Sequence, residues 1–158
     1  MKKTAEKEKS AKEPKGKPVL ITVNASAEAE GDEPESISLL TSGELWEEED
    51  GYRLRYEEQL NETTPTQVEI SLHKGIVTMQ RIGDYAANMV FRKGRRYEGI
   101  YNTPMGSLRL ALFCTQVNHA IDDRGGALHL RYQLDINEHY VAMHDMELCF
   151  AAKENLTQ

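Results

Sequence analysis

The sequence predicts an all-β fold, an antiparallel meander of short strands around one core. Apolar and polar residues alternate with a period of two over most of the chain after Pro18, and turn residues recur at intervals close to the ~8–12 residues typical of all-β domains. No window of ~11 residues shows the 3.6-residue apolar period of a helix. An open sheet of about ten strands would leave edges exposed to aggregation, so we expect it to close into a barrel or to split into a sandwich.

The first five expected strands are separated by recognisable turns. Asp50-Gly51 is a strong hairpin signal, and Lys74-Gly75 turns the chain a second time. In the second strand the apolar positions change phase at Leu40, before Gly43, which predicts a bulge or a bend. These strands are expected at residues 19–27, 35–49, 52–57, 68–72 and 76–81, with a loop at residues 61–65 before the fourth.

The second half continues the same pattern. The Thr-Pro-Met-Gly segment at residues 103–106 is a corner, because Pro104 fixes φ and Gly106 permits a backbone angle that other residues resist. The long strand after it changes apolar phase between Leu112 and Phe113, which predicts that it bends around a barrel. The remaining strands are expected around residues 89–91 and at residues 97–103, 107–121, 128–136 and 140–150.

The chain divides into a short tail and one domain. Residues 1–17 hold seven of the 19 basic and three of the 26 acidic residues, with no aromatic or β-branched aliphatic side chain. Such a segment cannot bury enough apolar surface to offset its ordering entropy, so we expect a disordered lysine-rich tail. Residues 18–158 are expected to form a single domain, which at this length needs no disulfide or metal to fold.

Charge and cysteine content exclude several classes of function. The tail carries a charge of +4 and the rest of the chain −11, which argues against nucleic-acid binding by the domain, because phosphate contacts need clustered Lys and Arg. Cys114 and Cys149 are too few for a disulfide framework, and we expect both to be buried as small hydrophobic residues. With no signal peptide and no apolar run of ~18 residues, the expected location is the cytoplasm, with no membrane partner.

No motif for catalysis, metal binding or cofactor binding stands out. The five histidines do not show the spacing of a zinc site, so we expect them on the solvated surface. No nucleophile-elbow or phosphate-cradling motif is present, and the acidic run at residues 44–50 is typical of a solvated strand edge. The sequence therefore predicts no catalytic residues, no metal and no cofactor.

The most suggestive side chains are amphipathic residues on apolar rows. Tyr52, Tyr56 and Tyr132 lie in phase with inward aliphatic residues, Arg81 continues the row of Val77 and Met79, and Arg109 precedes the phase change in its strand. Ligand pockets in barrels are mostly apolar with a few such polar groups. The alternative is that each Tyr packs its ring and bonds its hydroxyl, while each Arg extends to the rim.

Four segments together resemble the YwiB-like family of small uncharacterised bacterial proteins: "YNTPMGSLRLALFC", "DDRGG", "ALHLRYQLDIN" and "MELCF". The resemblance covers roughly residues 18–150 and is most specific over residues 101–136. It implies a lipocalin-like (calycin-like) antiparallel barrel of about 8–10 strands, located in the cytoplasm, with no established activity and no catalytic residues to carry over. Met105 stands where an aromatic residue is expected in the family.

These observations lead to two hypotheses of different classes. The first is a non-enzymatic protein that binds a small apolar or amphipathic ligand inside the barrel. The second is a structural or protein-interaction module, as a monomer or a homodimer, that acts through its outer face around a filled barrel. An enzyme ranks below both. Under the first hypothesis the candidate ligand-binding residues are Tyr52, Tyr56, Arg81, Tyr101, Met105, Arg109 and Tyr132.

Overall fold

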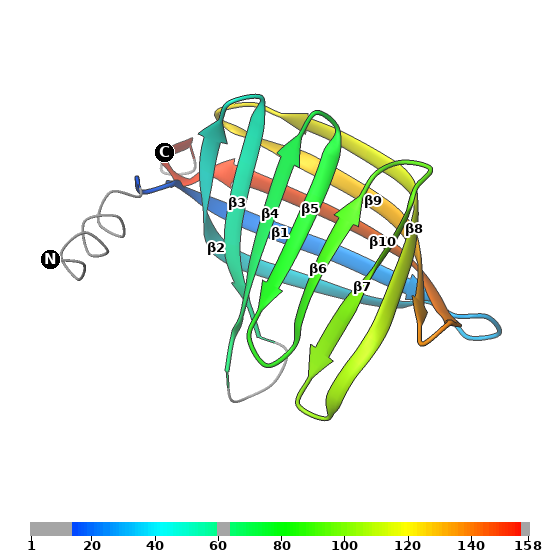
Figure 1. Cartoon of the computed structure of the whole chain (residues 1–158). Coiled ribbons are helices and arrows are strands. Elements are labelled where there is room, and N and C mark those ends of the chain that lie inside the picture. Colours follow the sequence, from blue (N-terminus) through cyan, green and yellow to red (C-terminus); the bar gives the residue numbers. More distant parts are fainter. Residues whose placement is uncertain (1–13, 60–63, 156–158) are drawn as a thin grey trace, which may run out of the picture.

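The computed structural model describes residues 14–59 and 64–155, and within them the chain is an all-β meander (Figure 1). Ten antiparallel strands close into one barrel in the order β1-β10-β9-β8-β7-β6-β5-β4-β3-β2, which confirms the predicted fold class and the barrel over the sandwich. The strands are β1 (Lys17–Glu28), β2 (Glu35–Glu48), β3 (Gly51–Glu58), β4 (Thr66–His73), β5 (Ile76–Ile82), β6 (Ala86–Phe91), β7 (Arg96–Thr103), β8 (Gly106–Ile121), β9 (Gly125–Ile136) and β10 (His139–Ala152). A short 3-10 turn, Lys153–Asn155, follows β10.

Pairing of the first strand with the last closes the barrel. β1 pairs with β10 from Val19↔Ala152 to Glu28↔Met143 and with β2 on its other side, so it has a partner on both edges. Two hairpins turn through a pair of residues that both have positive φ, Lys74-Gly75 and Asn137-Glu138. Those left-handed angles match the twist of a two-residue hairpin, which explains why the meander reverses at these dipeptides.

The predicted phase change in β8 is confirmed, and the one in β2 is not. In β8 the register shifts between Cys114 and Gln116, so Thr115 forms a bulge and the inward positions pass from even to odd numbers. The switch lies two residues after Phe113, which points outward and is 40% exposed. In β2 the pairing with β1 runs without interruption from Ala27↔Glu35 to Lys17↔Leu45, so Leu40 simply faces solvent on the outer surface.

The barrel has one weakly paired seam. The ladder between β6 and β7 contains Ala86↔Asn102 and Ala87↔Tyr101 and does not continue along the rest of either strand. By contrast, β4 and β5 pair along their whole lengths, from Gln67↔Ile82 to His73↔Ile76. Closure between β6 and β7 therefore depends on a short ladder at one end of the barrel.

The N-terminal part of the described chain packs on the outside of the barrel. Pro14 accepts a hydrogen bond of 2.7 Å from Nε1 of Trp46, and the backbone N–H of Gly16 donates to Glu44 at 3.0 Å. Ordered chain therefore begins at least three residues before the tail boundary predicted after residue 17, whereas residues 1–13 of the predicted tail lie outside the described residues. The predicted loop at residues 61–65 also lies mostly outside them.

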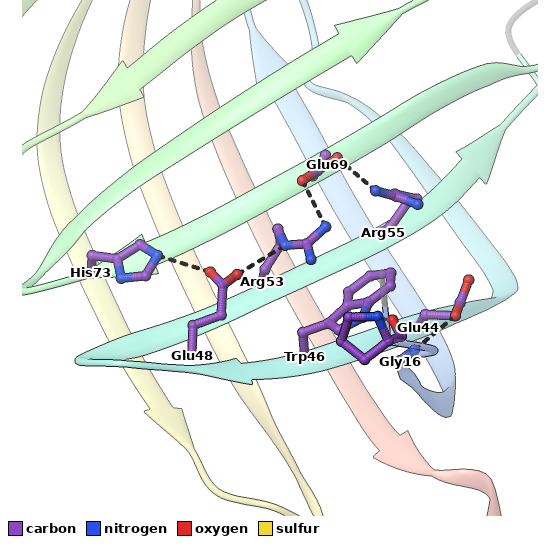
Figure 2. Close-up of polar contacts among 9 residues, drawn as sticks. Gly16, Glu44, Trp46, Glu48, Arg53, Arg55, Glu69 and His73 are labelled. Carbon is purple, nitrogen blue, oxygen red and sulfur yellow. Dashed lines mark hydrogen bonds and ion pairs between the residues drawn. The ribbon is translucent and has the colours of Figure 1, made fainter. Parts of the chain in front are cut away.

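Trp46 is buried although it belongs to the acidic run expected to be a solvated edge. The guanidinium groups of Arg53 and Arg55 lie 4.1 and 4.9 Å from its ring centroid, and its side chain is 7% exposed (Figure 2). The carboxylates of this outer face form ion pairs, with Glu48 joining Arg53 and His73, and Glu69 joining both arginines. Because the barrel is closed, the acidic run covers a paired strand rather than a free edge.

The two cysteines occupy different environments. Cys114 is fully buried in the core, as predicted, and burial raises the pKa of its thiol. Cys149 is on the outer face and only half-buried, which corrects the prediction that both are core residues. Its place follows from alternation, because Leu148 and Phe150 on either side point inward. The described residues contain no helix with the length and apolarity that crossing a membrane requires.

Candidate ligand pocket at one end of the barrel

The interior is filled at one end and hollow at the other. At the end with the β2–β3 hairpin, packed side chains leave a void of about 20 Å³. At the opposite end, which carries the β1–β2 and β9–β10 connections, a cavity of about 440 Å³ lies within the range of ~300–1,000 Å³ typical of ligand sites. We call this cavity the mouth pocket; its apolar lining includes Ala25, Ile37, Ala87, Met89, Leu110, Leu134, Ile136, Val141 and Met146.

A charged pair lies in the wall of the mouth pocket. Arg81, the inward residue near the end of β5, donates from Nη1 to Oε2 of Glu58 at the end of β3, at 2.6 Å. The side chains are 21% and 14% exposed. Burial by itself lowers the pKa of Arg81, but the charge and hydrogen bond of Glu58 outweigh it, so this pKa is raised and the guanidinium stays ionised. The pair therefore contributes one positive and one negative charge at the same point.

Three tyrosines surround Arg81. Burial raises the pKa of Tyr132 to about 12 and also raises the pKa values of Tyr56 and Tyr101, while the positive charge of Arg81 opposes the rise in all three. The hydroxyls therefore stay protonated at neutral pH and can donate hydrogen bonds. Within residues 14–59 and 64–155, no hydrogen bond reaches any of these three hydroxyl groups.

His144 completes the polar side of the mouth pocket. Its ring stacks on Tyr132 with centroids 5.1 Å apart and an interplanar angle of 6°. Burial lowers the pKa of His144, so the imidazole is neutral near pH 7. Its Nε2 is buried without a hydrogen-bond partner in the described structure. Phe91 meets the same tyrosine edge-on, with centroids 4.9 Å apart, and fixes the Tyr132 ring from the core.

Four of the seven residues predicted for ligand binding come together here. Arg81, Tyr101 and Tyr132 line the mouth pocket, and Tyr56, which is 3% exposed, lies in the core beside them. They converge because β3, β5, β7 and β9 run in the same direction, so three of the four lie near the strand end that reaches the pocket. Tyr101 also contacts Tyr85 on the rim, with ring centroids 6.3 Å apart.

The other three predicted residues lie elsewhere. Tyr52 lines the small void at the filled end of the barrel. Met105 is 98% exposed at the tip of the β7–β8 hairpin, where the Thr103 hydroxyl accepts from the Met105 N–H and donates to Gly106 O, so this segment is a corner. Arg109 points outward and pairs with Glu138 at 3.2 Å. None of the three contributes to the mouth pocket.

Glu58 and His144 are pocket residues that the sequence reasoning missed. Both lie in phase with rows that were identified as inward, Glu58 after Tyr56 and His144 before Met146. Alternation places both side chains inward, whereas their residue types are typical of the surface, so only the alternation marks them as pocket residues. His144 thereby corrects the expectation that the histidines are solvated.

A second polar cluster lies on the outer face of β9 and β10. Nε2 of His129 contacts Oδ1 of Asp145 at 2.9 Å, and Arg131 donates to the same carboxylate at 3.1 Å. The other ring nitrogen of His129 faces the amide of Gln116 at 3.5 Å, so no nucleophile completes a triad in this part of the chain. Within the described ranges, no three His, Cys, Asp or Glu side chains could hold a metal ion together.

Comparison with known proteins identifies relatives without assigning an activity. Residues 21–148 match the family described as Domain of unknown function (DUF1934). Among solved structures, the crystal structure of the ywiB protein from Bacillus subtilis is similar, with a TM-score of 0.76 and 20% sequence identity over 86% of this chain and 92% of that chain. No curated protein matches the sequence.

Proposed function

The chain belongs to the DUF1934 family, and we propose that its barrel is a non-enzymatic binding protein for a small amphipathic ligand, which the mouth pocket holds. The observation that carries this proposal is the half-filled interior. A barrel that served only as a scaffold would gain stability by filling both ends, since closely packed interiors are the rule and voids cost free energy. Here one end leaves about 20 Å³ and the other about 440 Å³.

The lining fits an amphipathic ligand better than a purely apolar one. Most of the wall is aliphatic, and its polar residues are Arg81, Glu58, the tyrosines, His144 and Asp145. The carboxylate of Asp145 is bonded to His129 and Arg131 on the outer face. An alkane would leave the tyrosine hydroxyls, Nε2 of His144 and the remaining donors of Arg81 without partners in a dry pocket, which costs free energy. A ligand with one polar head and an apolar tail satisfies both parts of the wall.

The rim of the barrel supports the same function. Five of the eight large apolar side chains that are markedly exposed lie at the mouth-pocket end. They are Ile37, Ile82, Met105, Tyr140 and Val141. The other three, Leu40, Ile100 and Phe113, face outward on the barrel wall. They are not adjacent: Leu40 is on β2, and on the neighbouring strands β7 and β8 the partner of Ile100 is Arg109, four residues before Phe113. Ile37 and Val141 of this group line the mouth pocket itself, and the other three lie around the same end of the barrel.

The test is a titration with a neutral fluorescent apolar probe, N-phenyl-1-naphthylamine, followed by displacement with 1-alkanols of six to ten carbons. Each added methylene that enters the pocket contributes ~0.8 kcal/mol, so affinity should rise about fourfold per carbon until the pocket is full. Absence of saturable probe binding to the folded protein would refute the proposed function.

Two variants locate the binding. Leu134→Trp fills the mouth pocket from β9 and should abolish probe binding, whereas Tyr52→Phe at the filled end should leave it unchanged. Thermal unfolding of both variants checks that each is folded. Retained binding in a folded Leu134→Trp protein would place the probe outside the mouth pocket.

A further inference from the structure

The polar groups of the mouth pocket are balanced in charge. Arg81 and Glu58 are joined by one hydrogen bond, Nη1 to Oε2, and the pair has no net charge. Tyr56, Tyr101 and Tyr132 remain neutral because burial raises the pKa values of their hydroxyls. His144 is neutral as well. Asp145, the remaining charged residue of the lining, has its carboxylate paired with Arg131 on the outer face. The pocket therefore presents dipoles and compensated ion pairs, and no excess charge of either sign.

The same groups leave hydrogen-bonding capacity unused. The single bond between Arg81 and Glu58 occupies one of the five N–H donors of the guanidinium and one of the two carboxylate oxygens. Over the described ranges, no other hydrogen bond to either side chain is present. A ligand head that accepts from Arg81 or a tyrosine hydroxyl, and donates to the second oxygen of Glu58, would satisfy both kinds of group.

From these two features we infer that the mouth pocket selects amphiphiles whose head group is uncharged and both accepts and donates hydrogen bonds, a primary alcohol or a primary amide. This inference rests on the proposed function, because it names the ligand class of the same site. The aliphatic wall takes the tail, and the head lies at the Arg81–Glu58 pair.

Charged heads are disfavoured by the neighbouring member of the pair. A carboxylate close enough to bond Arg81 also lies near Glu58, so repulsion from Glu58 offsets the attraction of Arg81 while the ligand still loses its hydration. An ammonium head meets the reverse arrangement, attracted by Glu58 and repelled by Arg81. A neutral head is neither attracted nor repelled as an ion by the two charged side chains, and its desolvation cost is much smaller.

The test compares four ligands of equal chain length, 1-decanol, decanamide, decanoate and decylammonium, by displacement of N-phenyl-1-naphthylamine at pH 7.5. We expect the alcohol and the amide to bind roughly tenfold or more tightly than either ion. If decanoate or decylammonium binds as tightly as decanol, or if none of the four displaces a probe that itself binds, the head-group inference is overturned and the proposed function stands. If the probe itself does not bind, the proposed function fails first.

Charge-changing variants sharpen the test. Glu58→Gln leaves Arg81 uncompensated, so decanoate should gain about tenfold in affinity while decanol changes little. Arg81→Gln should favour decylammonium in the same way. Arg109→Gln removes an arginine from the outer surface and is the matched control, in which the order of the four ligands stays that of the wild type. Unchanged affinities of decanoate in folded Glu58→Gln protein and of decylammonium in folded Arg81→Gln protein would contradict the inference. The wild-type comparison stands even if one of these variants does not fold.

Discussion

The Arg81–Glu58 pair should show strong energetic coupling in a double-mutant cycle. We expect Glu58→Gln and Arg81→Met to destabilise the protein by about 2–4 kcal/mol each, and the double variant by much less than the sum. The estimate follows from burial. Exposed ion pairs contribute ~0–1 kcal/mol to stability, whereas breaking a fully buried pair costs ~3–5 kcal/mol. The side chains of Arg81 and Glu58 are 21% and 14% exposed, so this pair is closer to the buried case. Removing both charges leaves no buried ion without a partner.

The measurement is urea unfolding, with circular dichroism as the signal and the fluorescence of Trp46, the one tryptophan of the sequence, as a second probe. The same cycle on Arg109 and Glu138 is the control. That pair has a longer N–O distance of 3.2 Å and side chains 65% and 75% exposed, so its coupling should stay below about 0.5 kcal/mol. Equal coupling energies in the two cycles would refute the claim that burial of the Arg81–Glu58 pair gives it its energetic weight.

Two further predictions concern the outer face and pH. Trp46→Phe loses the hydrogen bond to Pro14 O and should cost about 1 kcal/mol in urea unfolding followed by circular dichroism; an unchanged midpoint would show that this bond contributes nothing. Burial lowers the pKa of His144 below its usual 6.5, so as pH falls through 6.5 the unfolded chain binds the proton first and stability drops. His144→Gln should reduce the loss of stability between pH 7 and 5 in thermal melts, whereas the exposed-site control His119→Gln should not, and equal slopes in the two variants would contradict this.

The fold was predictable because a half-buried strand has a simple signature. Each strand buries one face, so alternation of apolar residues marks it directly, and hairpin dipeptides such as Lys74-Gly75 mark where it reverses. The error at Leu40 has a physical reason as well. A single apolar residue out of phase indicates a bulge only if an extra residue interrupts the ladder, and β2 pairs with β1 without interruption. In β8 the whole apolar row changes parity, and there the bulge is real.

Alternation predicted which side chains point inward, but it could not predict at which end of the barrel they lie, as Tyr52 at the filled end shows. Tyr56, Arg81 and Tyr132 each continue an alternating apolar row, and each lies at or beside the mouth pocket. Met105 belongs to a segment that is characteristic of the family, and Arg109 lies near a phase change, but neither property determines which face a side chain occupies. In the structure, Met105 lies at a hairpin tip and Arg109 points outward.

Three inward rows become polar at the hollow end of the barrel. Along β3 the inward side chains change from Leu54 through Tyr56 to Glu58, and along β5 from Val77 through Met79 to Arg81, so both rows become polar toward the end of the strand. Along β10 the polar residue comes first instead, with His144 preceding Met146, Leu148 and Phe150.

In an antiparallel barrel these opposite orders converge in space, because β10 runs against β3 and β5. Polar residues at the ends of odd-numbered strands and at the start of even-numbered ones therefore meet at one mouth, while the aliphatic ends of the same rows pack together at the other. Chance placement of polar residues would scatter them over both ends. Their convergence on the hollow end, in rows far apart in the sequence, supports a site built for a ligand with a polar head and an apolar tail.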